Sequence, residues 1–314
     1  MKSLISAKLA DHPSAGLSLE PAPLYELPRL SARLGHRIYI LREDLTCFGL
    51  GGNKVRKLDY LIGDALAQGA EVLLTSGASS FSRNLAAAGK VFGLEVHVLV
   101  PGEESAHNAA SRALFEEFEA TLHHGVDYAS VLERLTGEGR RVYELHPGGS
   151  DEIGALAYLR VFDQVVAHSD ASGVHFDRIF LPSGSTATQV GLLLGQAITG
   201  YATSVIGVAI SQTAGVQRQR VLELAVSTAR MLGVAFDESL VQIDDRFLGD
   251  GYALPSPAGR AAVRTFAHLE GILLDQVYTG KAAAGLIRHA ADGRFSKSDN
   301  VLFVHTGGNF GLFY

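Results

Sequence analysis

Short apolar segments alternate with longer amphipathic ones along this chain, and that pattern restricts the fold more than any other feature. Several of the apolar segments are unbroken runs of leucine and β-branched residues, without the alternation of a half-exposed strand. Such strands are typical of parallel sheets, because helices cover both faces of the sheet. We therefore predict an α/β fold with doubly wound, mostly parallel sheets and right-handed crossovers. The predicted strands cover 38–41, 72–75, 96–100, 142–145, 179–181, 205–210, 241–243 and 301–304.

Turns rich in glycine and serine follow three of these strands, at 76–80, 182–188 and 305–308. Ligands bind at the carboxyl ends of the strands in open α/β sheets. We therefore expect the three turns to meet at one shared cleft. The clearest helices between the strands cover 54–68, 82–92, 106–120 and 188–198.

The composition argues against several classes of function. The net charge is −6 and no long run of lysine and arginine occurs, which argues against nucleic-acid binding. Cys47 is the single cysteine, so we expect neither an intramolecular disulfide nor a zinc site. The most apolar late stretch, 191–211, is interrupted by Gln196, Tyr201 and glycines, and the N-terminus has no signal-like core. We expect a cytoplasmic protein that does not bind membranes.

Lys54 follows Gly51, Gly52 and Asn53 and begins an amphipathic helix. Asparagine is a common N-cap, so we expect Asn53 to cap this helix. A lysine in the first turn lies at the positive end of the helix dipole, which lowers its pKa and suits Schiff-base chemistry. The alternative is an ordinary solvated lysine, and we expect this of Lys57, which lacks such a context.

Four segments carry a resemblance to a known family. They are LREDLT at 41–46, GGNKVRKLDYLIGDALAQGA at 51–70, VYTGKAAAGLI at 277–287 and VLFVHTGG at 301–308. In this order they resemble the D-cysteine desulfhydrase and 1-aminocyclopropane-1-carboxylate (ACC) deaminase family. Its members use pyridoxal 5′-phosphate (PLP) and have the tryptophan-synthase-β type fold, also called fold type II.

The resemblance implies a PLP Schiff base on Lys54, with Asn53 among the cofactor-binding residues. The resemblance further implies a small amino-acid substrate and a homodimer. It also implies a large PLP-binding domain and a small mobile domain inserted into it. We place the large domain at 1–50 and 162–314, and the small domain at 51–161. The segment 147–150 is the best candidate for a hinge.

The turn SGSTATQVG at 183–191 resembles the phosphate-binding turn of the family. It follows a predicted strand and begins a helix, so its N–H groups and hydroxyls favour an anion. The alternative is a simple helix cap. The phosphate-binding residues that we predict are Gly184, Ser185, Thr186, Ala187 and Thr188.

The resemblance also implies roles for two tyrosines and two threonines. Tyr278 and Tyr252 match positions beside the substrate, where a phenol transfers a proton or binds a carboxylate. Thr306 is the first choice for the partner of the PLP ring nitrogen, and Thr279 is the alternative. ACC deaminases have a glutamate at the position of Thr279, and a hydroxyl suffices for β-elimination.

The stretch ASSFSRNLAAAG at 78–89 departs from the family pattern. Ser79 matches the catalytic serine, while Ser80 stands where an asparagine binds the PLP phenolic oxygen. Phe81 replaces histidine or glutamine, which we expect to change what lies beside the substrate. The alternative is that Ser79, Ser80 and Ser82 only cap a helix.

The function that the resemblance implies is a PLP-dependent carbon–sulfur lyase. It would eliminate a β-substituent from a small, D-cysteine-like amino acid and give a 2-oxo acid, ammonia and sulfide or another leaving group. ACC-deaminase-type ring opening, β-replacement by a PLP-dependent synthase and non-catalytic PLP binding are the alternatives.

Overall fold

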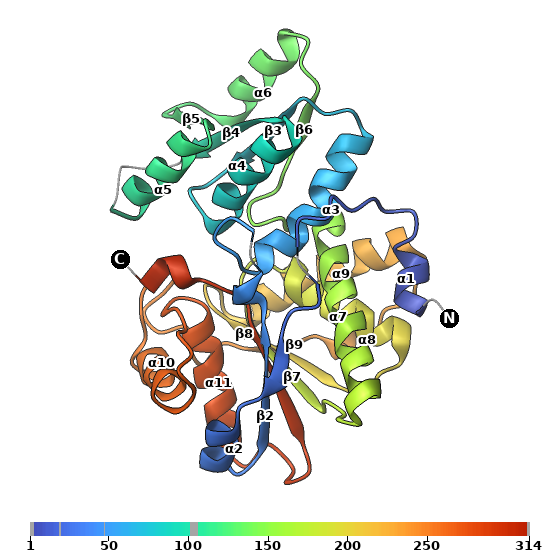
Figure 1. Ribbon diagram of the computed structural model, residues 1–314, viewed down its shortest axis with the longest axis vertical. Coiled ribbons are helices and arrows are strands. Elements are labelled where there is room, and N and C mark those ends of the chain that lie inside the picture. Colours follow the sequence, from blue (N-terminus) through green and yellow to red (C-terminus); the bar gives the residue numbers. More distant parts are fainter. Residues whose placement is uncertain (1–2, 19, 47, 101–105, 313–314) are drawn as a thin grey trace.

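The computed structural model describes residues 3–18, 20–46, 48–100 and 106–312, so Cys47 lies outside the described residues. Within these ranges the chain forms two sheets (Figure 1). No helix among the described residues is long and apolar enough to cross a membrane.

The larger sheet has six strands in the order β1-β2-β10-β7-β8-β9. Only β1 is antiparallel to its neighbour, and the other pairs are parallel. The strands are β1 (Leu24–Glu26), β2 (Arg37–Arg42), β7 (Arg178–Ser183), β8 (Ser204–Ala209), β9 (Gln242–Asp244) and β10 (Asn300–His305).

The smaller sheet has four parallel strands in the order β5-β4-β3-β6. They are β3 (Val72–Ser76), β4 (Glu95–Val100), β5 (Thr121–His124) and β6 (Val142–Glu144). All eight predicted strands are present, and β1 and β5 are additional.

Helices surround both sheets, and α3, α4, α5 and α8 confirm the four that we predicted. The α-helices are α1 (Leu4–Lys8), α2 (Pro28–Leu34), α3 (Asn53–Ala67), α4 (Ser80–Phe92), α5 (Ala106–Glu117), α6 (Tyr128–Gly137), α7 (Glu152–Ser172), α8 (Ala187–Thr199), α9 (Ala214–Leu232), α10 (Pro257–Glu270) and α11 (Thr279–Ala291). The 3₁₀ helices are η1 (Glu43–Leu45), η2 (Glu238–Leu240) and η3 (Asn309–Leu312).

The larger sheet is buried on both faces, as the unbroken apolar strands predict. In β7, Ile179 and Leu181 pack in one core with α7, α8 and α9, whereas Phe180 packs in another core with α10 and α11. Figure 1 shows these two groups of helices on opposite sides of the sheet. The doubly wound α/β prediction is therefore confirmed.

The expected domain boundary between residues 161 and 162 falls within helix α7. Leu156 before that point and Phe162 after it belong to the same core as the larger sheet. The loop from 145 to 151 joins the smaller sheet to α7.

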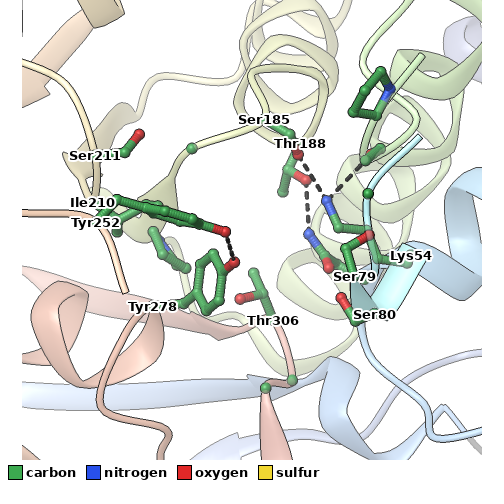
Figure 2. A pocket seen from close by; sticks show the side chains of 18 of the residues that line it. Lys54, Ser79, Ser80, Ser185, Thr188, Ile210, Ser211, Tyr252, Tyr278 and Thr306 are labelled. Atoms are coloured by element: carbon green, nitrogen blue, oxygen red, sulfur yellow. Dashed lines mark hydrogen bonds between the residues drawn. The ribbon is translucent and has the colours of Figure 1, made fainter. Parts of the chain in front are cut away.

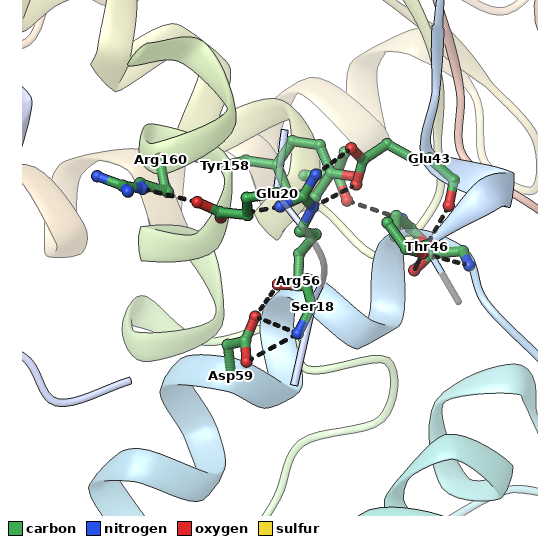
Figure 3. Close-up of polar contacts among 11 residues, drawn as sticks. Ser18, Glu20, Glu43, Thr46, Arg56, Asp59, Tyr158 and Arg160 are labelled. Atoms are coloured by element: carbon green, nitrogen blue, oxygen red, sulfur yellow. Dashed lines mark hydrogen bonds and ion pairs between the residues drawn. The ribbon is translucent and has the colours of Figure 1, made fainter. Parts of the chain in front are cut away.

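A buried ion-pair network fixes α3 to the larger sheet (Figure 3). Arg56 donates from Nε to Glu43 Oε2 and from Nη2 to Glu43 Oε1, each at 3.0 Å, and both side chains are almost completely buried. Glu43 also accepts a hydrogen bond from Tyr158 of α7 at 3.2 Å. Arg56 Nη1 reaches Glu20 at 2.8 Å. The network joins η1, α3, α7 and the N-terminal segment.

Candidate active site

A cavity of about 370 Å³ lies where the three glycine- and serine-rich turns meet. The turns after β3, β7 and β10 all line it, which confirms the prediction of one shared cleft. The start of α3, the segment 147–148 and the two tyrosines complete its walls. Figure 2 shows Tyr252 and Tyr278 across the cavity from Lys54.

Gly52 allows two backbones to lie against each other at the start of α3. It has a φ of +91°, and a Cβ on Gly307, whose φ is +103°, would lie 2.8 Å from Gly52 Cα. The Asn53 N–H donates to Thr306 O at 2.9 Å. The glycines are therefore needed for close contact between the lysine turn and the turn after β10.

Asn53 does not cap α3, so that prediction is wrong. Gly52 is the N-cap, and Asn53 is the first helical residue. The Asn53 side chain instead donates from Nδ2 to Thr188 Oγ1 at 3.0 Å. It thereby joins the lysine helix to the turn after β7.

Lys54 lines the cavity, and its Nζ donates to Ser185 Oγ at 2.7 Å and to Gly148 O at 3.2 Å. Burial lowers the pKa of Lys54 to about 8, against the opposing effect of a hydrogen bond with Lys57. The largest cause of this lowered pKa is desolvation. A pKa of about 8 leaves roughly a tenth of Lys54 as the free amine at pH 7.

Lys57 is completely buried, so the prediction of a solvated lysine is wrong. Its Nζ donates to Gly148 O at 3.1 Å and to Ser185 Oγ at 3.4 Å. Position 57 is one helical turn after Lys54, on the same face, and the 147–149 loop covers it. Burial and then the charge of Lys54 lower the pKa of Lys57 well below its usual value.

The turn after β7 leads into α8, which begins at Ala187. Gly184, Ser185 and Thr188 line the cavity. Thr186 and Ala187 are buried, and the Thr186 hydroxyl bonds to that of Ser150 at 2.8 Å. The positive end of the α8 dipole thus lies beside Lys54, as a bound anion requires.

Two glutamines that the sequence reasoning missed hold this turn in place. Ser183 Oγ donates to Gln189 Oε1 at 2.7 Å. Gln217 Nε2 donates to Ser183 Oγ at 2.9 Å and to Gly184 O at 3.2 Å. The sequence did contain a signal for this contact, because Gln189 is a polar residue within the otherwise apolar predicted helix 188–198.

Ser79 and Ser80 both line the cavity (Figure 2). Ser79 is also the N-cap of α4 and forms a capping box with Ser82, so it caps the helix in addition to lining the cavity. Phe81 is completely buried in the core beneath the smaller sheet. The expectation that Phe81 changes what lies beside the substrate is therefore wrong, because its side chain points into that core.

The Tyr252 and Tyr278 hydroxyls lie 2.6 Å apart, and both side chains line the cavity. Burial raises the pKa of Tyr278 well above its usual value, and the charges of Tyr252 and Asp275 raise it further. Tyr278 therefore keeps its proton at neutral pH.

Thr306 lines the cavity, whereas Thr279 is completely buried and is not among the described residues that line it. Thr279 Oγ1 donates to Asp275 Oδ1 at 2.6 Å and accepts from Asp275 N at 2.9 Å. The structure brings only Thr306 to the site. Asp275, which the sequence reasoning missed, also accepts from Tyr278 N at 2.7 Å and so positions that tyrosine.

No group of three or more His, Cys, Asp or Glu side chains that could hold a metal ion occurs in the described part of the chain.

Comparisons with known proteins agree with this geometry. The profile of the family described as "Pyridoxal-phosphate dependent enzyme" matches residues 17–307. D-cysteine desulfhydrase of Yersinia enterocolitica is 38% identical over 320 residues, covering 98% of this chain and 97% of that protein. D-cysteine desulfhydrase of Salmonella choleraesuis is 37% identical over 307 residues, covering 93% of each chain.

Solved structures agree as well. One described as an ACC deaminase homologue is 33% identical with a TM-score of 0.88, covering 99% of this chain and 96% of that one. A threonine deaminase from Solanum lycopersicum has a TM-score of 0.70 at 17% identity, covering 97% of this chain and 84% of that one, and shows the fold alone. This chain belongs to the pyridoxal-phosphate-dependent enzyme family, in the group of the D-cysteine desulfhydrases and ACC deaminase homologues, and PLP is its cofactor.

Proposed function

We propose that this protein is a PLP-dependent carbon–sulfur lyase that removes the β-substituent of a small, D-cysteine-like amino acid. The observation that carries the proposal is Lys54, whose pKa burial lowers to about 8 in a cavity with an anion-binding turn and two tyrosines. The products would be a 2-oxo acid, ammonia and sulfide. The relatives described as D-cysteine desulfhydrases support this choice.

The residues of the cavity fit PLP. Lys54 Nζ is the amine for the cofactor aldehyde, and the start of α8 with Ser185 and Thr188 is the place for its phosphate. Thr306 would face the ring nitrogen, and Ser80 the phenolic oxygen. When bound, PLP supplies an electron sink for the pair left on Cα.

Different side chains of the protein would carry out the separate proton transfers. Lys54, as a free amine, would take the Cα proton of the substrate. Tyr278, kept protonated, would donate to the departing sulfur, and Tyr252 would support its hydroxyl through their hydrogen bond. Ser79, at the start of α4, would bind the substrate carboxylate.

ACC deaminase activity is the second candidate, and the similarity to an ACC deaminase homologue favours it. The threonine at 279 argues against it, because the side chain is buried against Asp275 and offers no carboxylate to the cavity.

Release of 2-oxo acid by the PLP-loaded enzyme tests the proposal. The substrates would be D-cysteine, L-cysteine, L-cysteate, β-chloro-D-alanine, D-serine and ACC. Pyruvate with sulfide from D-cysteine is the expected result. 2-Oxobutanoate from ACC alone would favour ring opening, and consumption of an added thiol without oxo acid would favour β-replacement.

We further propose that the protein is a cytoplasmic homodimer and that its smaller sheet moves as a unit within 51–161. The resemblance supports the homodimer and the motion. Sedimentation equilibrium of the full chain would test the dimer, and hydrogen exchange with and without substrate would test the motion.

A further inference from the structure

A buried lysine reaches the loop that carries Tyr252. Lys281 lies in the first turn of α11, and its side chain has no exposed surface. Its Nζ donates to the carbonyl oxygen of Leu248 at 2.7 Å and to that of Gly251 at 2.9 Å. Lys281 is not among the described residues that line the cavity. Its amine therefore holds, from outside the cavity, the backbone directly before the tyrosine.

The tyrosine loop, residues 248–256, has an unfavourable backbone conformation. Ala253 has a φ of +62°, a left-handed conformation that costs free energy for a residue with a Cβ. Gly249 and Gly251 also have positive φ, at +64° and +141°. A strained backbone of this kind persists only where neighbouring groups hold it in place. The two hydrogen bonds from Lys281 are such a constraint.

Tyr252 depends on this backbone, because its own side chain has little packing around it. The residue is 56% exposed. Its ring meets the ring of Tyr278 edge-on, with 6.2 Å between the centroids, and the two hydroxyls lie 2.6 Å apart (Figure 2). A hydrogen bond weakens steeply when its distance or angle changes. A small movement of the tyrosine loop would therefore break the contact between the hydroxyls.

The start of α11 fixes the backbone at both tyrosines. Tyr278 is the N-cap residue of this helix, and its N–H donates to Asp275 Oδ2 at 2.7 Å. Lys281 follows one helical turn later and holds the tyrosine loop. One short segment of the chain thus sets the positions of both phenols.

We propose that Lys281 is a positioning residue whose amine holds the backbone before Tyr252 and so places the Tyr252 hydroxyl against that of Tyr278. The proposal rests on the function proposed above, in which Tyr278 donates a proton and Tyr252 supports its hydroxyl. It adds that this support depends on a buried amine that does not meet the substrate.

The first test measures the contact between the two hydroxyls without turnover, by NMR of PLP-loaded enzyme labelled with carbon-13 at tyrosine Cζ. Tyr278→Phe removes one hydroxyl and retains the ring, so it should shift the Cζ signal of Tyr252. Lys281→Met keeps the length of the side chain but has no donor, and in this background Tyr278→Phe should leave the Tyr252 signal nearly unmoved. A full shift in the Lys281→Met background would overturn the proposal, as would no shift in the original chain.

Gln196→Met is the matched control. The Gln196 side chain also donates to a backbone carbonyl, that of Thr203 at 2.7 Å, but this contact lies before the start of β8. The cavity lies beyond the other ends of the strands. The variant should therefore keep the full effect of Tyr278→Phe on the Tyr252 signal. A lost effect in this variant too would contradict a specific role for Lys281.

Steady-state kinetics with D-cysteine gives the second readout. Lys281→Met should lower kcat about tenfold with little change in KM, as expected when one supporting hydrogen bond is lost in the transition state. The double variant Lys281→Met/Tyr252→Phe should be no slower than Tyr252→Phe alone, because both changes act through the same hydroxyl. Losses that multiply in the double variant, or a change confined to KM, would overturn the proposal.

An ester in place of the peptide bond between residues 251 and 252 decides the question if Lys281→Met does not fold. Incorporation of the α-hydroxy acid of tyrosine at 252 makes the Gly251 carbonyl a weaker acceptor and leaves Lys281 in place. The effect of Tyr278→Phe on the Tyr252 signal should then shrink, and an unchanged effect would overturn the proposal. The NMR readout does not depend on turnover. A failed substrate panel with a lost effect in Lys281→Met would therefore reject the lyase and retain the role of Lys281.

Discussion

The N–H of Asn53 donates to the carbonyl oxygen of Thr306 at 2.9 Å, which joins the lysine helix to the turn after β10. The same contact brings Gly52 and Gly307 together. The amine of Lys54 and the hydroxyl of Thr306 therefore depend on one shared backbone contact for their relative position.

Gly307→Ala should destabilise the fold by about 3 kcal/mol and weaken PLP binding, because its Cβ would collide with Gly52 and its φ is positive. Urea unfolding and PLP titration measure the two effects. Gly200→Ala is the control: its φ is +68° but nothing lies within 4 Å, so about 1 kcal/mol is expected. Equal losses of stability in the two variants would contradict a collision between the added Cβ at position 307 and Gly52.

Lys54→Ala should remove covalent retention of PLP and lower lyase turnover by on the order of 10³-fold. The reason is the loss of both the linking amine and the base. Mass spectrometry after borohydride reduction, with circular dichroism to check folding, measures this. PLP still attached to the variant's polypeptide at this site would contradict the assignment.

Capture of PLP by the PLP-free chain should become faster with rising pH up to about 8, the value to which burial lowers the pKa of Lys54. Below that pH, each unit of acidification should cost about tenfold in free amine. Stopped-flow absorbance between pH 6 and 9 measures the rate. A rate that continues to rise steeply up to pH 10 would indicate an ordinary lysine.

Tyr278→Phe should lower turnover by on the order of 10²-fold with little change in KM, because it removes a proton donor from the cavity. Tyr252→Phe should have a smaller effect, since its hydroxyl acts through that of Tyr278. Steady-state kinetics with D-cysteine measures both. A larger loss of turnover in Tyr252→Phe would indicate that Tyr252, and not Tyr278, donates the proton.

Glu43→Gln should destabilise the chain by about 3–5 kcal/mol, because Arg56 would keep a buried charge without its main partner. Denaturant unfolding measures the change. Glu138→Gln, which breaks the exposed pair with Arg134, is the control and should cost less than about 1 kcal/mol. Similar values for both variants would argue against the importance of burial.

The sequence patterns allowed the larger features of the fold to be predicted. Unbroken apolar runs identified eight strands, but β1 and β5 are short and only partly apolar, so they did not stand out. The glycine turns predicted the cleft because strand ends and turn residues are local signals.

What the sequence did not indicate at the site depended mostly on how side chains pack and pair in the folded chain. Lys57 is buried by a loop about 90 residues later. Phe81 points into a core that its family position did not indicate, and Thr279 is bound by Asp275. The resemblance to the family suggested roles for residues by their place in the sequence. Packing in the folded chain decides which of their side chains reach the cavity.

The place of β10 has a consequence for synthesis on the ribosome. This strand is formed by residues 300–305, yet it lies between β2 and β7 in the middle of the larger sheet. The smaller sheet, complete by Glu144, can pair while translation continues, but the two halves of the larger sheet stay separate until the last strand emerges. A nascent chain that stalls before residue 300 would therefore expose apolar strand edges and lack the turn that carries Thr306.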